Sequence, residues 1–191
     1  MKKMLLVASC MCALASGSAY AQSQPGYGGA AKSKSGAASA QGPRLLDVRP
    51  FVQETAQGGF AGVELARLAL TKGSSDDVRG FAQRMLEASE KINNDMKPFL
   101  KTHNVSVPAE IDTRHKVTRD WLMTLSGSAF DRAYMAAMNA KLTNDATFYQ
   151  RASMQANDPD VKTWAAGALP LVQEHQKMAS EINRKIAGAS R

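Results

Sequence analysis

Apolar residues recur at helical spacing from residue 45 onward, and no stretch of this region alternates apolar and polar residues as a half-buried strand does. The longest series advances in alternating steps of four and three residues: Val78, Ala82, Met85, Ser89, Ile92, Met96, Phe99 and His103. A helix with such a stripe buries it against neighbouring helices. The sequence therefore predicts an all-α fold built from packed amphipathic helices.

Breaks in this pattern divide the region into four long helices and one short helix. We expect long helices over residues 50–71 and 76–103, and a short helix over residues 112–125. Two further long helices are expected to begin near residues 128 and 159. Each break contains Gly, Ser, Asn, Asp or Pro, which are the residues that end helices or start new ones.

Capping residues mark three of the expected helix starts. Ser74 or Ser75 caps the second long helix. Ser128 stands three residues before Asp131, in the spacing of a capping box at the start of the third long helix. Asp158 precedes a proline at the first position of the fourth, which is a strong start signal.

The lengths of the connections predict how the long helices are paired. Short turns join the first to the second and the third to the fourth, whereas residues 104–127 separate the two pairs. Two close hairpins joined by one long connection are typical of a ferritin-like four-helix bundle. We therefore predict a ferritin-like bundle domain over residues 45–187, with a crossover connection that contains the short helix.

The N-terminus has the features of an export signal. Two lysines precede an apolar run over residues 4–15, and small residues follow at the two positions that a signal peptidase inspects. We expect residues 1–21 to be a signal peptide, cut between Ala21 and Gln22. The apolar run is shorter than the roughly 20 residues that span a bilayer, so a permanent anchor is the weaker alternative. A periplasmic or secreted protein without a transmembrane span is expected.

Both cysteines, Cys10 and Cys12, lie inside the expected signal. The mature chain would then contain no thiol, which excludes disulfides, thiol catalysis and thiolate metal sites. A lipoprotein signal with Cys10 as the modified residue is an alternative. It would leave only residues 4–9 as the apolar region, which is too short for a working signal.

Residues 22–44 are mostly Gly, Ala, Ser and Gln, and are predicted to be a disordered linker because they offer almost nothing to bury. The chain has 24 Lys and Arg residues against 17 Asp and Glu residues. Five of the basic residues stand at or before position 44: Lys2, Lys3, Lys32, Lys34 and Arg44. The bundle is therefore nearly neutral. The basic linker could contact an anionic envelope surface or act as a spacer, and nucleic-acid binding is not expected.

Four stretches resemble the exported bacterial ferritin-like proteins grouped as domain of unknown function 4142, which are often described as outer-membrane proteins. They are residues 58–65 (GGFAGVEL), 78–85 (VRGFAQRM), 125–135 (LSGSAFDRAYM) and 158–175 (DPDVKTWAAGALPLVQEH). The resemblance implies a four-helix fold and an extracytoplasmic location. It implies no reaction.

Ferritin-like bundles hold metals with Glu residues and Glu-x-x-His pairs, and no Glu-x-x-His occurs in this chain. The resemblance implies polar ligand positions near residue 62, at residues 88–89 and 141–142, and at His175. In this chain only His175 keeps a ligand at these positions. The resemblance therefore implies a degenerate site.

The metal-ligand candidates that remain are Glu64, Glu90, Asp145 and His175, and a site built on Glu64, Asp145 and His175 would suit iron or manganese. In the alternative, His175 is a neutral core residue hydrogen-bonded to Asp145 or Tyr149, and Glu64 and Glu90 are solvated residues at the flanks. The two other histidines stand near helix ends or in the crossover, and we expect both to be exposed.

No catalytic motif is present, since the chain lacks a nucleophile elbow, a phosphate-binding glycine loop and a recognisable triad. The first hypothesis is a non-enzymatic envelope or stress-associated binding or structural protein, with no cofactor. The second is a metal-binding or oxidoreductase bundle that uses Glu64, Asp145 and His175. The nature of any partner stays open.

Overall fold

Five helices make up the part of the chain that the computed structural model describes, residues 47–107 and 110–188. They are α1 (Val48–Lys72), α2 (Asp76–Thr102), α3 (Thr113–Met123), α4 (Gly127–Gln155) and α5 (Pro159–Gly188). No strand occurs within these two ranges. The predictions of an all-α fold and of a helical bundle are confirmed. The predicted signal peptide, its cleavage point and the linker lie outside the described residues.

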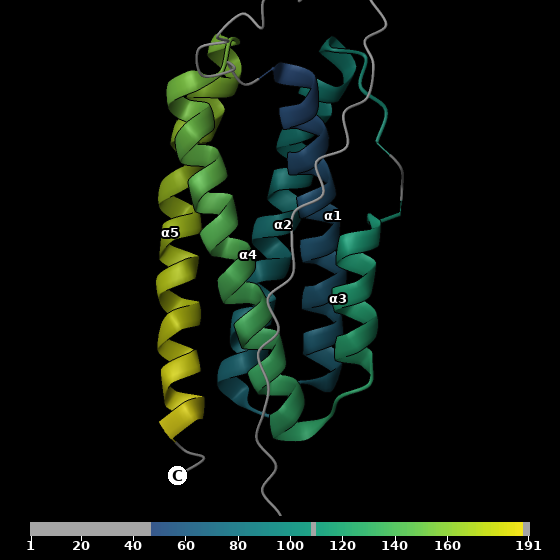
Figure 1. The fold of residues 1–191 in the computed structure, drawn as a ribbon, viewed down its shortest axis with the longest axis vertical. Coiled ribbons are helices and arrows are strands. Elements are labelled where there is room, and N and C mark those ends of the chain that lie inside the picture. Colours follow the sequence, from purple (N-terminus) through teal and green to yellow (C-terminus); the bar gives the residue numbers. More distant parts are fainter. Residues whose placement is uncertain (1–46, 108–109, 189–191) are drawn as a thin grey trace, which may run out of the picture. The chain divides into compact units, whose positions relative to one another are not determined.

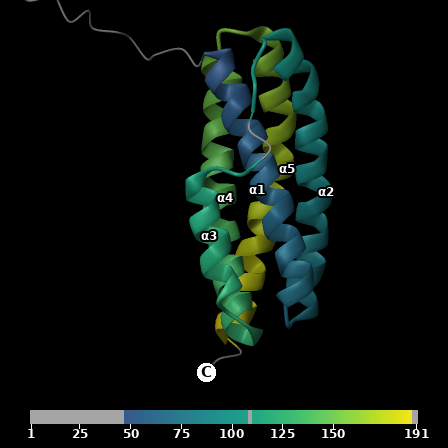
Figure 2. The ribbon, with the colours of Figure 1, turned by 90° about the vertical axis from the view of Figure 1, so that its right-hand side faces the viewer.

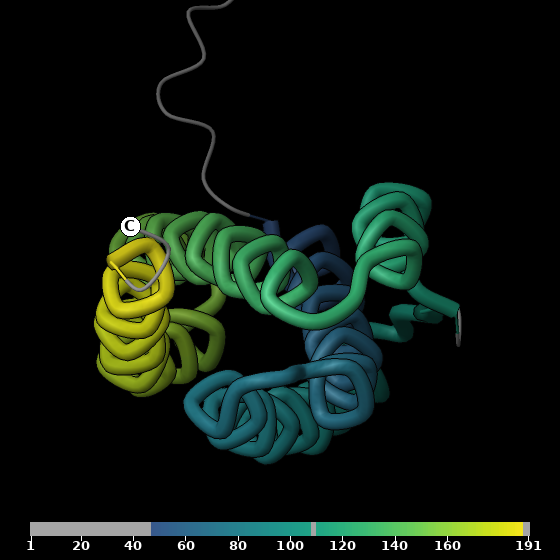
Figure 3. Tube along the Cα trace, turned by 90° about the horizontal axis from the view of Figure 1, so that it is seen from below, coloured from purple at the N-terminus to yellow at the C-terminus, as the bar shows by residue number. Residues whose placement is uncertain are grey.

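The four long helices form two antiparallel pairs (Figure 1). α1 packs along α2, and α4 packs along α5, whereas contacts of α1 with α4 and of α2 with α5 are sparser. Viewed along the helices, the four lie at the corners of a square (Figure 3). The connection after α2 returns the chain to the other end of the bundle, so α2 and α4 run in the same direction (Figure 1).

The short helix α3 lies outside this square. It contacts both α1 and α4, and it covers the side on which those two helices face each other (Figures 2 and 3). The predicted crossover with a short helix is therefore present in the structure. None of the described helices combines the length and apolar character that a membrane-spanning helix needs.

In the sequence of α1, apolar residues recur at helical spacing at Val52, Ala56, Phe60, Val63 and Leu70, but the buried face of the helix differs from this stripe. Val52 is fully buried as expected, but Phe60 and Val63 are only half-buried. Gly59 and Gly62 stand in the buried face instead. They let α2 come close, because a Cβ on Gly62 would lie 2.1 Å from the Oγ of Ser89.

Two of the predicted helix caps are present. The Ser75 hydroxyl accepts a hydrogen bond of 3.1 Å from the backbone N–H of Val78 at the start of α2. At the start of α5, the Asp158 carboxylate accepts hydrogen bonds from the N–H groups of Asp160 and Val161, at 2.8 and 3.2 Å. Both caps are local in sequence, which is why they could be predicted.

The predicted capping box at Ser128 is wrong. α4 begins at a glycine that follows Ser126, and the Ser126 side chain makes no capping hydrogen bond. Asp131 is buried and turns toward the α1–α2 connection instead. Its carboxylate accepts hydrogen bonds from the backbone N–H groups of Ser74 and Ser75, both at 2.9 Å, and from the Ser74 hydroxyl at 2.6 Å.

Candidate functional site

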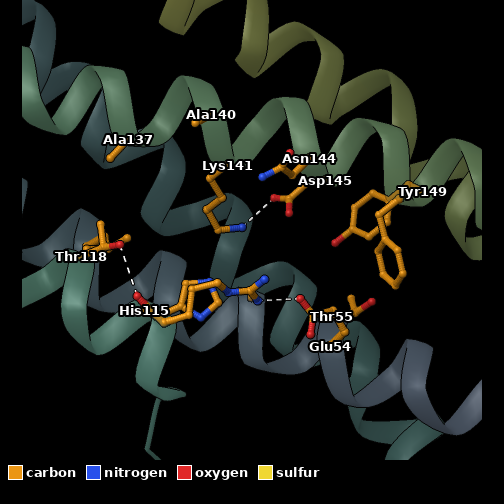
Figure 4. A pocket seen from close by; sticks show the side chains of 14 residues that line it. Glu54, Thr55, His115, Thr118, Ala137, Ala140, Lys141, Asn144, Asp145 and Tyr149 are labelled. Carbon is orange, nitrogen blue, oxygen red and sulfur yellow. Dashed lines mark hydrogen bonds and ion pairs between the residues drawn. The ribbon is translucent and has the colours of Figure 1, made fainter. Parts of the chain in front are cut away.

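A pocket of about 430 Å³ lies between α1, α3 and α4, on the side of the bundle that α3 covers (Figure 4). It exists because α3 covers the side on which α1 and α4 face each other but does not fill the space between those two helices. Its walls combine apolar residues, including Leu65 and Phe148, with charged side chains from all three helices. Enclosed concave sites with a few polar groups are where proteins hold small molecules.

Ion pairs fix α3 against α1 and so define one wall of the pocket. Arg114 binds Glu54 with 2.7 Å between guanidinium nitrogen and carboxylate oxygen, and Arg119 binds Glu64 at 2.9 Å. The Asp112 carboxylate caps the start of α3 by accepting a hydrogen bond of 2.9 Å from the third residue of the helix. Arg114 and Glu54 both line the pocket.

The opposite wall carries a second ion pair, within α4. Lys141 and Asp145 are one helical turn apart, and the lysine ammonium donates a 2.6 Å hydrogen bond to the carboxylate. Their side chains are only 16% and 25% exposed. The ammonium also approaches α1, because a Cβ on Gly58 would lie 3.7 Å from it. Gly58 thus leaves room for Lys141.

His115 lies on α3 in the wall of the pocket (Figure 4), and its side chain is 13% exposed. The expectation that it would be exposed is therefore wrong. Burial lowers the pKa of His115, and the nearby cations Arg114 and Lys141 lower it further, against the opposing effect of Asp112. The Nδ1 atom lies 3.0 Å from the Asp112 carboxylate. The imidazole is therefore biased toward its neutral form.

Tyr149 closes one end of the pocket together with Phe148. The Tyr149 side chain is buried, and burial followed by the negative charge of Asp145 raises the pKa of its hydroxyl. It belongs to an aromatic cluster in which its ring lies 5.1 Å from that of Trp164 and 5.9 Å from that of Phe148.

The structure does not gather the three predicted metal ligands. Glu64 binds Arg119 at the α1–α3 contact, and Asp145 binds Lys141 in the pocket. His175 is on α5, where it is 7% exposed. Within the described ranges, no three His, Cys, Asp or Glu side chains lie close enough together to hold a metal ion. The residues present therefore do not fit the predicted metal site.

His175 has the core position that its spacing predicted. Burial lowers its pKa, and Arg84 on α2 lowers it further against the effect of Glu174. No hydrogen bond joins it to Asp145 or Tyr149 in the part of the chain that the structure describes. The remaining candidate acid, Glu90, forms an exposed ion pair with Arg67.

Sequence reasoning missed the pocket and most of its charged residues. Lys141 and Asp145 carried one local signal, since opposite charges four residues apart pair on a helix. Arg114 and Glu54 carried none, because 60 residues separate them. Their pairing depends on where α3 packs, which helical periodicity does not specify.

Comparison with known proteins identifies two matches. The family model described as Domain of unknown function (DUF4142) matches residues 31–182. A solved structure titled "CopM in the Cu(II)-bound form" superposes with a TM-score of 0.63 at 15% sequence identity, over 74% of this chain and 98% of that chain. At that identity the likeness shows a shared helical fold. No curated protein matches the sequence.

Proposed function

This chain belongs to the family of Domain of unknown function (DUF4142), and from that premise we propose that it is an exported, non-enzymatic helical bundle that binds a small molecule in the pocket between α1, α3 and α4. Export is supported by the predicted signal over residues 1–21. A ferritin-like origin is supported by the two hairpins and the crossover that carries α3. We place the protein in the periplasm or among secreted proteins, in an envelope or stress-associated role.

The observation that carries the proposal is the charged, partly enclosed interior of the pocket. Two ion pairs from three different helices face this space, with aromatic and aliphatic residues beside them. The Lys141–Asp145 pair is largely shielded from water, and desolvating charged groups costs free energy, so a binding role explains why this pair lines a pocket where an apolar wall would pack better. All four charges are held in ion pairs, which favours holding a ligand over transferring protons.

The proposal is tested by filling the pocket. Gly58→Leu places an isobutyl group where Lys141 approaches α1, and Gly167→Leu on α5 is the matched control because no atom lies within 4 Å of a Cβ there. Small molecules are screened by the rise in melting temperature that binding produces. We expect at least one compound to stabilise the native protein and Gly167→Leu but not Gly58→Leu. Equal stabilisation of all three proteins would contradict the proposal.

A second candidate function is metal binding, with copper, iron or manganese as the metal. It is favoured by the structural neighbour, which was solved with Cu(II), whereas the separation of Glu64, Asp145 and His175 speaks against the site expected from the sequence. The test is elemental analysis of the purified protein after exposure to iron, manganese, copper and zinc. Stoichiometric metal that is lost in His175→Ala would establish this candidate, and no retained metal would exclude it.

A further inference from the structure

We propose that the ligand of this pocket is a small organic acid with an apolar body, whose carboxylate binds the Lys141 ammonium while Arg114 faces it from the α3 wall. The inference rests on the proposed function and names the class of ligand. It follows from three properties of the pocket: the depth of each charge, the donors that stay unused, and the apolar walls.

The deepest charge in the pocket is positive. The Lys141 side chain is 16% exposed and that of its partner Asp145 is 25% exposed. The pair on the opposite wall is nearer the surface, because Glu54 is 50% and Arg114 is 65% exposed. A ligand that enters the pocket as far as Lys141 therefore meets a positively charged ammonium, and an anionic group on the ligand would complement that charge.

The Lys141 ammonium also has N–H donors available for hydrogen bonds to a ligand. An ammonium carries three N–H donors, and Lys141 gives one to Asp145. Arg114 carries five donors, gives one to Glu54 and also lies 3.6 Å from the Asp112 carboxylate. The Lys141 ammonium is largely shielded from water, so a carboxylate that accepts from its remaining donors offsets the cost of burying them, and the more exposed Arg114 adds a second positive charge on the facing wall. Figure 4 shows the Lys141 ammonium pointing into the space between α4 and α3.

The remaining lining selects an organic acid over an inorganic anion. Leu65 and Tyr149 are buried, Phe148 is half-buried, and all three contribute apolar surface to the pocket. The volume of about 430 Å³ lies within the range of small-molecule sites. A compact aromatic or branched aliphatic body would bury these surfaces, whereas a hydrated inorganic ion would leave them exposed to water.

The test uses three probes that share a phenylethyl body and differ in the head group, which is an anion, a neutral amide or a cation: 3-phenylpropionate, 3-phenylpropanamide and 3-phenylpropylamine. Isothermal titration with the purified exported protein measures each affinity. We expect the carboxylate to bind at least about tenfold more tightly than the amide, because a hydrogen bond to a charged group is stronger than one to a neutral group. The amine should bind most weakly of the three.

Variants assign the effect to Lys141. Lys141→Met keeps the length of the side chain and should weaken carboxylate binding by about tenfold or more. Lys185→Met is the matched control, because Lys185 pairs with Asp77 in an exposed ion pair on other helices and should bind as the native protein does. Asp145→Asn frees Lys141 from its competitor and should tighten carboxylate binding. Asp145→Asn gives a result even if Lys141→Met fails to fold.

The outcomes separate this inference from the proposed function. If the amide or the amine binds the native protein as tightly as the carboxylate, and Gly58→Leu abolishes that binding, the pocket is a binding site but the organic-acid assignment is wrong. Unchanged carboxylate affinity in Lys141→Met would also overturn the assignment. If no probe and no compound of the wider screen binds, the proposed function fails together with the inference.

Discussion

Asp131 is a residue of α4 that completes the turn between α1 and α2. It is 3% exposed and accepts three hydrogen bonds from Ser74 and Ser75, two of them from backbone N–H groups that precede α2. A buried carboxylate is tolerated only where such donors surround it. The residue thus joins the two hairpins at one end of the bundle through hydrogen bonds, in addition to the apolar core.

We predict that Asp131→Ala lowers the free energy of unfolding by on the order of 3 kcal/mol, because it removes the charged acceptor of three partly buried hydrogen bonds. Urea denaturation followed by circular dichroism measures this loss. Asp77→Ala is the control, since Asp77 is an exposed residue in the first turn of α2 and its loss should cost about 0.5 to 1 kcal/mol. Equal costs for the two variants would show that the interhelical hydrogen bonds contribute little.

Two histidines make the stability of the protein depend on pH. Burial lowers the pKa of both His115 and His175 below the ordinary histidine value of about 6.5. The unfolded chain therefore binds more protons than the folded one once the pH falls below about 6.5. The contribution of the neutral histidines to the free energy of unfolding is fully present above that pH. It is lost as the pH falls through the two lowered pKa values.

We predict that the free energy of unfolding decreases as the pH is lowered from about 7 to 5, in a window above the titration range of ordinary carboxylates. The double variant His115→Gln and His175→Gln should reduce this slope, whatever its effect on stability at pH 8. Denaturation curves at a series of pH values measure both proteins. A slope that is the same in the two proteins would show that these imidazoles are not responsible.

Residue positions were predictable where the determinant is local in sequence. The caps at Ser75 and Asp158 were predicted correctly, because each side chain binds an N–H group two or three residues away. Asp131 and His115 were assigned wrongly, because their surroundings come from segments distant in sequence. His115 is half-buried only because α3 packs beside Lys141 and the rest of the pocket wall.

At the scale of elements, two glycines of α1 let α2 approach closely. A Cβ on Gly59 would lie 2.2 Å from the Oδ1 of Asn93, and one on Gly62 would lie 2.1 Å from the Oγ of Ser89. The position of α2 against α1 therefore depends on two missing side chains. The same contact occupies the space at residues 62 and 89, two positions where the family resemblance implied metal ligands.

We predict that Gly62→Ala lowers the free energy of unfolding by about 1 to 3 kcal/mol, because the added methyl group overpacks a tight interface. Gly80→Ala on α2 is the control: a Cβ there meets no atom within 4 Å, and alanine should stabilise the helix by about 0.5 to 1 kcal/mol. Combining Gly62→Ala with Ser89→Gly should recover part of the loss. Thermal denaturation of the three variants, compared with the native protein, measures these changes.

Helix positions could be predicted from periodicity, but the buried face of α1 could not. The seam from Val78 to Met96 is buried or half-buried as expected, since its apolar residues are large and evenly spaced. On α1 the large residues Phe60 and Val63 turn partly outward, and small residues face α2. Periodicity favours large apolar residues, whereas close packing selects glycine and alanine. The burial of a helix face that carries glycines is therefore underestimated when only the sequence is used.

At the scale of the molecule, the placement of α3 determines the candidate site. Each hairpin is formed by helices adjacent in sequence, and short turns specify their antiparallel packing. The α1–α4 contact is sparser, and α3 bridges it through Arg114 and Arg119 on one side and contacts with α4 on the other. The pocket is thus a property of the crossover connection, which is the part of the chain whose path the sequence specified least.

For the chain as a whole, we expect export with removal of residues 1–21, followed by folding outside the cytoplasm without thiols. Both of its two cysteines precede Gln22, so removal of residues 1–21 leaves none. We predict that protein recovered from the envelope or the medium has the intact mass of a chain beginning at Gln22, and that a reducing agent leaves its melting temperature unchanged. Ala21→Arg should leave the precursor uncut, because the peptidase requires a small residue there. A lipid-modified mass starting at Cys10 would instead establish the lipoprotein alternative, and the native helices would then be tethered to a membrane surface.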